Sequence, residues 1–266
     1  MTATTHAPAA NGTPVAMPAP GPTTSLYRQP VPVSREQHAT ARVAPITDWR
    51  IVQGLNAVPV SSVEFAEVAR ELPIAFVATG RDEQGRPQVT PVVLMGLRDG
   101  ENLCVAPDGR WLGTYVPASL RRYPFAYAMS ADQQVGLVAD AAWEGFGGET
   151  GERLFDDAGA PSAYLQSMLQ FLDQFEREML RTRALCDRLV AHDLLRGGEI
   201  RGELPDGRSV NAGGFFMIDE DKLAKLADEA VLELHRSGLM GLIHAHRVSM
   251  GHVQTLARRL GELPAG

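Results

Sequence analysis

The sequence predicts an α+β protein in which a small, mainly antiparallel, barrel-like sheet precedes a long helix, a β-hairpin and C-terminal helices. Short apolar runs separated by tight-turn residues fill residues 46–140, a pattern typical of antiparallel strands. Apolar residues then recur every three or four positions across 161–195, as in an amphipathic helix. Two further apolar runs flank Pro205-Asp206-Gly207 and indicate the hairpin.

The first 45 residues differ in composition from the rest of the chain. They are rich in Ala, Pro, Thr and Gly and contain few large apolar side chains. Burying such a segment would not offset the entropy of ordering it, so we expect residues 1–45 to form a flexible tail. A proline-rich docking segment is the less favoured interpretation. Residues 46–266 then form the globular domain, with a subdivision near 145–160.

The start of the predicted domain alternates short strands with one helix. Apolar residues in 49–52 and 58–60 predict two strands, and Ser62 is suited to cap a helix over 63–70. A strand over 74–79 and an open polar turn over 80–87 follow. These elements supply the first part of the expected sheet.

The stretch from Pro91 to Ala128 carries two Asp-Gly turns. Asp99-Gly100 lies between the apolar runs 92–95 and 103–105, which predicts a hairpin because Gly adopts positive φ at little steric cost. Asp108-Gly109 predicts a second reversal. Pro117 suits the first turn of a short helix over 118–122, and Pro124 should end it before a strand over 125–128.

The second half of the domain is predicted to be mainly helical. A helix over 161–195 is long enough to invite a break after Arg181, and its apolar stripe fits intramolecular core better than a homo-oligomer contact. The hairpin covers 199–218. Asp219 caps a short helix, a further helix stops at Gly238, and the last helix spans about 239–260.

Composition restricts the classes of function. The formal net charge of −7 disfavours a general nucleic-acid binder. The sequence contains no apolar run long enough for a membrane-spanning helix, so an integral membrane protein is not expected. Cys104 and Cys186 sit among apolar neighbours, as buried reduced cysteines do. The start of the chain lacks a secretory-signal pattern, so we expect a cytoplasmic protein.

Arginine and aromatic side chains concentrate at the turns of the central stretch. Arg provides a planar fork for carboxylates, and Trp and Tyr provide broad contacts at low entropic cost. We therefore predict a binding site here and call it the arginine-aromatic cluster. It consists of Arg98, Asp99, Arg110, Trp111, Tyr115, Arg121, Arg122 and Tyr123.

A structural interpretation of the same residues is favoured over the binding one. Arg98 can pair locally with Asp99, and Arg110 with Asp108, while Trp111 and Tyr123 pack in the core. The prediction of a binding site thus depends on whether these side chains share one open concavity.

No catalytic residue, metal ligand or cofactor is assigned from the sequence. His244 and His246 lie two positions apart, which points them to different sides of a helix, and His252 is two turns away from His244. No Ser lies in a G-x-S-x-G turn. The segment from Trp143 to Gly151 lacks the spacing of a dinucleotide loop and is expected to be a flexible connector.

Several segments together resemble the SapC family of bacterial proteins, across about residues 49–260. The resemblance lies in PVVLMGLRDGENLCV, DGRW and YVPASLRRYPFAY, and later in GERLFDDAGAPSAYLQSMLQFL, RTRALCDRL and GFFMIDEDKLAKL through LELHRSGLMGLIHAHRVSMGHVQTLAR. The family is named for an association with a bacterial surface layer, and an unrelated permease shares the name. The resemblance implies the fold and a link to surface-layer biology, and it transfers no reaction.

Three functional hypotheses follow. The leading one is a non-enzymatic binding or accessory protein that recognises a peptide or protein partner, in surface-layer or export biology. The alternative is a metal- or cofactor-assisted tailoring enzyme acting on a peptide or small molecule. A purely structural subunit that assembles through the long helix is the third.

Overall fold

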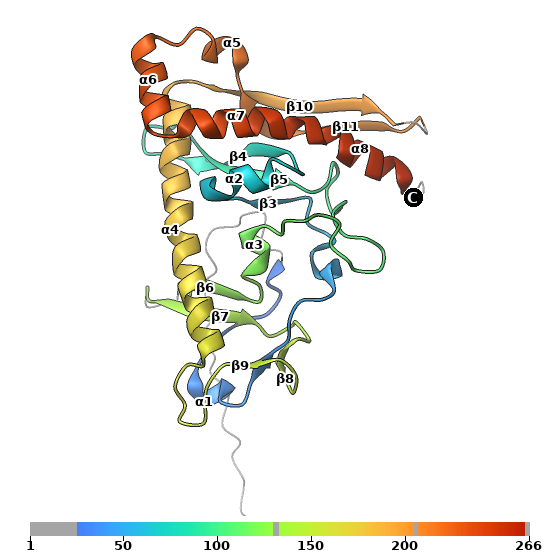
Figure 1. Ribbon diagram of the computed structural model, residues 1–266, viewed down its shortest axis with the longest axis vertical. Coiled ribbons are helices and arrows are strands. Elements are labelled where there is room, and N and C mark those ends of the chain that lie inside the picture. Colours follow the sequence, from blue (N-terminus) through green and yellow to red (C-terminus); the bar gives the residue numbers. More distant parts are fainter. Residues whose placement is uncertain (1–25, 130–132, 205–206, 264–266) are drawn as a thin grey trace, which may run out of the picture.

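The computed structural model describes residues 26–129, 133–204 and 207–263, and it confirms the α+β class (Figure 1). Antiparallel strands are divided among three sheets rather than gathered in one. The long helix, the hairpin after it and the C-terminal helices all follow in the expected order.

The largest sheet contains five strands. Their order is β10 (Leu195–Glu203), β11 (Ser209–Ile218), β4 (Ile74–Arg81), β5 (Pro87–Leu94) and β3 (Ala57–Pro59). β4 and β5 form a hairpin around the predicted polar turn, where Asp82 accepts the backbone N–H groups of Gln84 and Arg86. β10 and β11 form the second predicted hairpin.

Two three-stranded sheets complete the strand architecture. The first has the order β1 (Pro30–Pro32), β7 (Val135–Asp140) and β6 (Phe125–Met129), so that β6 lies at its edge. The other has the order β8 (Phe146–Gly148), β2 (Arg42–Val43) and β9 (Glu152–Arg153).

Helices connect and cover these sheets. In the described part of the chain the α-helices are α1 (Arg35–His38), α2 (Phe65–Val68), α3 (Ala118–Arg121), α4 (Ala163–Ala191), α5 (Glu220–Leu223), α6 (Asp228–Arg236), α7 (Leu239–Ser249) and α8 (Val253–Glu262). Short 3-10 helices span η2 (Trp49–Val52), η3 (Ser62–Glu64) and η4 (Met250–His252).

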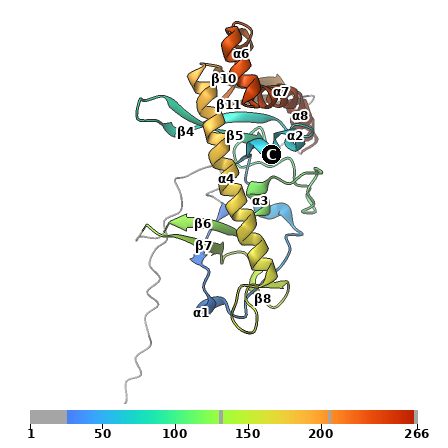
Figure 2. The same cartoon turned by 60° about the vertical axis from the view of Figure 1, so that its left-hand side comes forward.

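α4 is continuous, without the break predicted after Arg181, and runs along the molecule from the small sheets to the large one (Figures 1 and 2). Ser162 caps its first turn by accepting the N–H of Leu165. Its apolar stripe is buried within the chain, as the periodicity predicted, at Leu165, Leu172, Phe175, Cys186 and Leu189. α4 ends at Ala191, before the predicted limit at 195, and β10 begins at Leu195.

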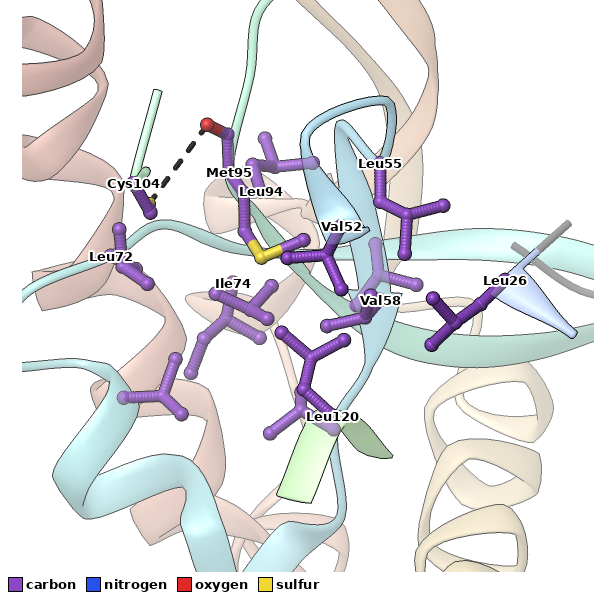
Figure 3. Close-up of a cluster of buried hydrophobic side chains, with 14 of the residues drawn as sticks. Leu26, Val52, Leu55, Val58, Leu72, Ile74, Leu94, Met95, Cys104 and Leu120 are labelled. Atoms are coloured by element: carbon purple, nitrogen blue, oxygen red, sulfur yellow. Dashed lines mark hydrogen bonds between the residues drawn. The ribbon is translucent and has the colours of Figure 1, made fainter. Parts of the chain in front are cut away.

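The core is one contiguous cluster of buried apolar side chains drawn from all three sheets and from the helices. Figure 3 shows the part in which Val58 of β3, Ile74 of β4 and Leu120 of α3 converge. Each of these three side chains is fully buried. Burial on this scale supplies most of the driving force for folding.

Residues 26–45 are structured, contrary to what their composition predicted. Leu26 and Tyr27 are buried, and β1 and β2 pair with strands more than 100 residues away. Their partners are remote in sequence, so local composition did not reveal them. The tail prediction is therefore wrong for residues 26–45, and its first part lies outside the described residues.

Three further local predictions are corrected by the structure. Residues 49–52 form a 3-10 helix instead of a strand, because Asp48 accepts the N–H of Arg50 and caps the turn. The helix predicted over 63–70 is shorter and follows a capping box formed by Ser61 and Glu64. The segment expected as a connector contains β8, which pairs with β2.

The first Asp-Gly turn does not join two strands. Gly100 takes positive φ as expected, but β5 already has β4 on one side and β3 on the other. Residues 103–105 therefore have no free edge to pair with, although the N–H of Leu103 and the thiol of Cys104 both reach the carbonyl of Met95.

Candidate functional site

The second Asp-Gly turn is a tight reversal, as predicted. Val105 pairs with Trp111, and Gly109 takes a φ of 86°. The backbone N–H of Trp49 donates to the Gly109 carbonyl, and a Cβ on Gly109 would lie 2.3 Å from Asp48 Oδ1. Glycine is needed here for both reasons.

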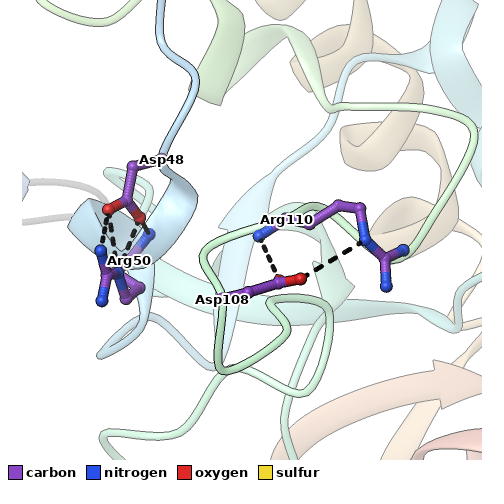
Figure 4. Close-up of polar contacts among 4 residues, drawn as sticks. All are labelled: Asp48, Arg50, Asp108 and Arg110. Carbon is purple, nitrogen blue, oxygen red and sulfur yellow. Dashed lines mark hydrogen bonds and ion pairs between the residues drawn. The ribbon is translucent and has the colours of Figure 1, made fainter.

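Arg98, Asp99 and Arg110 make local contacts at the two turns. Arg98 Nη2 donates to Glu101 Oε1 across 2.7 Å, and Asp99 accepts from Asn56 Nδ2. Figure 4 shows Arg110 directed toward Asp108, whose Oδ2 lies 3.9 Å from Arg110 Nε. The Arg110–Asp108 pair matches the structural interpretation, whereas Arg98 pairs with Glu101 in place of Asp99.

Trp111 belongs to the hydrophobic core. Its ring packs against Trp49 with centroids 5.6 Å apart, and its Nε1 donates to the carbonyl of Tyr115. Trp111 is thus satisfied within the chain and offers little surface to a ligand.

A buried carboxylate organises the approach to α3. Glu64 is 4% exposed. It accepts hydrogen bonds from the N–H and hydroxyl of Ser61, from the Tyr115 hydroxyl and from the Ala118 N–H, at 2.7 to 3.0 Å. Burial, and after it the Glu64 charge, raises the pKa of Tyr115 to about 12. Sequence pattern could reveal the Ser61–Glu64 capping box but not the full network, because Tyr115 and Ala118 are remote from Glu64 in the chain.

Arg121 lies between two rings at the surface. Its guanidinium is 5.6 Å from the Tyr115 ring centroid and 5.2 Å from that of Phe171, and its Nε donates to the Val116 carbonyl. These contacts join Trp111, Tyr115 and Arg121 into one continuous group.

Tyr123 faces the opposite way, into the core beside the first small sheet. Its hydroxyl donates to Asp140 Oδ2 across 2.8 Å, and burial raises its pKa far above the usual value. Asp140 is fully buried and also accepts the backbone N–H groups of Arg28, Gln29 and Ala142. Asp140 thereby fixes Arg28 and Gln29 against β7.

Arg122 is the cluster member that enters a concavity. Its guanidinium stacks on Phe175 of α4 at 4.6 Å from the ring centroid, and its Nη1 lies 3.4 Å from Glu176 Oε1. The Arg122 Nε is buried and has no hydrogen-bond partner among the described residues. Of the eight predicted residues, this is the one that lines the groove described next.

A groove of about 670 Å³ lies between β6 and α4, and we call it the β6–α4 groove. Its walls are mostly apolar and are formed by residues 126–129 of β6, Val135, Pro59 and one side of α4 from 173 to 179. Side chains of consecutive strand residues point to opposite faces. Since four consecutive residues line it, the groove runs along the open edge of β6.

Most polar groups of the groove are already paired. Tyr127 Oη donates to Asp173 Oδ1 across 2.7 Å, and Arg122 pairs with Glu176. Arg177 is exposed, and in residues 26–129, 133–204 and 207–263 it makes no ion pair. The groove therefore combines an apolar lining with one unused positive charge.

The histidines considered as metal ligands are separated by their contacts. His246 is buried, where its Nδ1 donates to the Ile74 carbonyl and its Nε2 accepts the N–H of Ile218. His252 bonds the Ala69 carbonyl, and His244 lies beside Arg247. Within the described residues, no three His, Cys, Asp or Glu side chains converge to hold a metal ion.

Both cysteines are free and buried. Burial raises the pKa of each thiol to about 12, which keeps Cys104 and Cys186 protonated at neutral pH. They act as small apolar side chains, which agrees with the interpretation of their sequence surroundings.

The fold and the groove define an α+β protein with three antiparallel sheets, a long connecting helix and an apolar concavity at a strand edge. The chain matches the SapC family model over residues 33–256 and belongs to that family. Comparisons with curated proteins and with solved structures found no significant match.

No helix in the described segments has both the length and the apolar character that a membrane span needs.

Proposed function

We propose that this SapC-family chain is a non-enzymatic binding or accessory protein that holds a peptide or a segment of a partner protein. The observation that carries the proposal is the β6–α4 groove, with its apolar walls and the unused charge of Arg177. Ligand sites in proteins are typically concave and mostly apolar, with a few placed polar groups.

The groove moves the proposed binding site away from most of the arginine-aromatic cluster. Arg122 stays in the site, because it lines the groove and stacks on its wall. Trp111 and Tyr123 are core residues, and Arg98 and Arg110 belong to separate turns. A partner that contacts Tyr115 and Arg121 would do so on a different part of the surface.

The cellular setting is part of the same proposal. Two free buried cysteines fit a reducing compartment such as the cytoplasm. The link to surface-layer or export biology is supported by the meaning of the family name alone. The alternative of a tailoring enzyme stays a prediction, since none of these contacts tests it.

The test is a selection of random linear peptides against the full chain by messenger-RNA display. Selected peptides are then titrated by fluorescence anisotropy against the wild type and two variants. Val135→Glu places a charge at the groove, and Val248→Glu makes the same change at a comparably exposed site on α7 (67% and 70% exposed).

We expect Val135→Glu to weaken binding by at least ~tenfold, because an apolar ligand would have to desolvate the new carboxylate. Val248→Glu should bind as the wild type does. A selection that yields no peptide, or equal affinities for both variants, would overturn the proposal.

A further inference from the structure

The backbone of β6 presents unused hydrogen-bonding groups to the groove. The Asp140 N–H donates to the Pro124 carbonyl, so the bonded pairs between β6 and β7 continue at Ala126 with Val138 and Ala128 with Gly136. Successive residues of a strand direct their N–H and C=O groups to opposite sides. Tyr127 and Met129 therefore direct theirs away from β7.

Contacts on the other side of β7 agree with this assignment. The carbonyl of Leu137, which lies opposite Tyr127, accepts from the N–H of Val33 next to β1. Leu137 thus faces β1 and leaves the backbone of Tyr127 without a partner in β7. Because β6 is the edge of its sheet, no strand of the described chain occupies the outer side.

An open strand edge offers its backbone to another strand. Exposed edges are templates for pairing, and proteins that use them bind extended peptides through main-chain hydrogen bonds. Here the edge is not freely exposed: α4 forms one wall of the space beside it, and Pro59 of β3 contributes to another. A segment bound there would lie enclosed between two elements.

We propose that the β6–α4 groove takes an extended segment of a partner protein, which adds to the edge of β6 as a fourth strand and places a carboxylate against Arg177. This inference rests on the proposed function and states its mode of recognition. The bound segment accepts from and donates to the backbones of Tyr127 and Met129.

The side chains of the groove define the chemistry of that segment. Met129, Val135, Phe175 and Met179 provide apolar surface, which suits apolar side chains at alternate positions of the segment. Glu176 is paired with Arg122, whereas Asp173 accepts from the neutral Tyr127 hydroxyl and keeps its negative charge. Arg177 is the cation of the lining that makes no ion pair in the described residues, so charge complementarity at Arg177 favours an acidic residue or a terminal carboxylate at that point of the segment.

The first test uses the backbone of the selected peptides. The tightest-binding peptide from the display experiment is synthesised in two forms, each N-methylated at alternate residues. A strand presents one set of N–H groups to β6 and the other away from it. We expect one form to lose at least ~tenfold in affinity and the other to bind nearly as the parent does.

The second test measures amide hydrogen exchange by NMR. The amides of Tyr127 and Met129 should exchange at least ~tenfold more slowly when the peptide is bound, as hydrogen-bonded amides do. The Asp140 amide, which is already bonded to Pro124, serves as the internal control.

The third test concerns the charge. Arg177→Glu should weaken binding of an acidic peptide by at least ~tenfold, whereas Arg183→Glu, at another exposed arginine on α4 outside the groove, should not.

The outcomes separate the inference from the proposed function. If the peptide is sensitive to Val135→Glu but both N-methylated forms bind alike and the two amides are unchanged, strand addition is overturned and the binding function stands. If Val135→Glu has no effect, the proposed function fails as well. If the chain forms a dimer in sedimentation that Met129→Pro dissociates, a second copy takes the edge and the partner proposal is overturned.

Discussion

At the residue scale, two buried carboxylates hold together parts of the chain that are distant in sequence. Glu64 joins the turn before α2 to Tyr115 and the start of α3. Asp140 joins β7 to residues 28 and 29 and to Tyr123. Each carboxylate is buried, and each accepts several hydrogen bonds, which is the condition under which a buried charge is tolerated.

Replacing Glu64 with alanine should destabilise the protein by about 2–4 kcal/mol. The substitution leaves the Ala118 N–H and the Tyr115 hydroxyl without their acceptor in a buried site, and each unpaired group costs about 1–3 kcal/mol. The free energy of unfolding from urea titration measures the loss.

Glu67→Ala is the matched control, because Glu67 lies on the neighbouring turn and pairs with Arg70 at the surface. Exposed pairs of this kind contribute about 0–1 kcal/mol. Equal free energies of unfolding for the two variants would mean that the network around Glu64 does not stabilise the fold.

His246 should make stability depend on pH below about 6.5. Burial lowers the pKa of its imidazole from the usual value of 6.5, with Glu220 and Arg247 as the nearby charges that act on it in opposite directions. Protonation would also put a proton on Nε2, which accepts the N–H of Ile218. The unfolded chain therefore takes up the proton first as pH falls.

The sign follows from this difference in proton uptake. The contribution of neutral His246 is fully present above pH 6.5 and is lost as pH falls below it, by up to ~1.4 kcal/mol per pH unit. Urea unfolding of the wild type and of His246→Gln across this range isolates the effect. Parallel pH profiles for the two proteins would contradict it.

At the scale of elements, sequence pattern was sufficient where the interactions are local. The Asp108-Gly109 reversal, the short helix between Pro117 and Pro124 and the amphipathic α4 follow from turn chemistry and periodicity. These features need no knowledge of what packs against them, and the structure contains all three.

Sequence pattern did not predict those parts of the structure that depend on residues far away in the chain. Tyr27 sits in proline-rich surroundings and is buried because its ring packs against Tyr123 and its hydroxyl donates to the Phe125 carbonyl. The β6–α4 groove was missed for the same reason, since its two walls are far apart in the sequence. Arg122 was found, because it lies among turn residues that already carried unusual side chains.

α4 offers a direct comparison of one substitution at two positions. Leu172 is fully buried and Leu180 is 67% exposed. Leu172→Ala should cost about 2–5 kcal/mol, because it removes apolar contacts and leaves a cavity. Leu180→Ala should change stability by about 0.5 kcal/mol or less.

Urea unfolding followed by circular dichroism measures both variants. Because the helix propensities of the two substitutions are the same, their difference reports tertiary packing alone. Equal losses would mean that α4 is stabilised by its own backbone rather than by the core.

At the scale of the whole molecule, the three sheets share one core. The buried apolar residues form a single cluster, and α4 contacts both β5 of the large sheet and β9 of a small one. The arrangement in Figure 1 therefore has a continuous interior, although its strands belong to separate sheets. Elements that bury surface against one another are expected to unfold together.

This continuity predicts one cooperative unfolding transition, which the tryptophans can report. The Trp143 ring contacts Tyr123 edge-on near the small sheets, and the Trp49 ring packs at a tilt against Trp111 near the turns. In Trp143→Phe, fluorescence follows the second pair, and in a double variant with Phe at positions 49 and 111 it follows Trp143. Within each protein, the fluorescence midpoint in urea should equal the midpoint from far-ultraviolet circular dichroism, which reports the helices.

Comparing two probes in the same protein removes the effect of the substitution on stability. Separate midpoints would instead divide the chain into units that unfold independently, and a boundary near 145–160 would then be the first to examine, because Trp143 lies just before it.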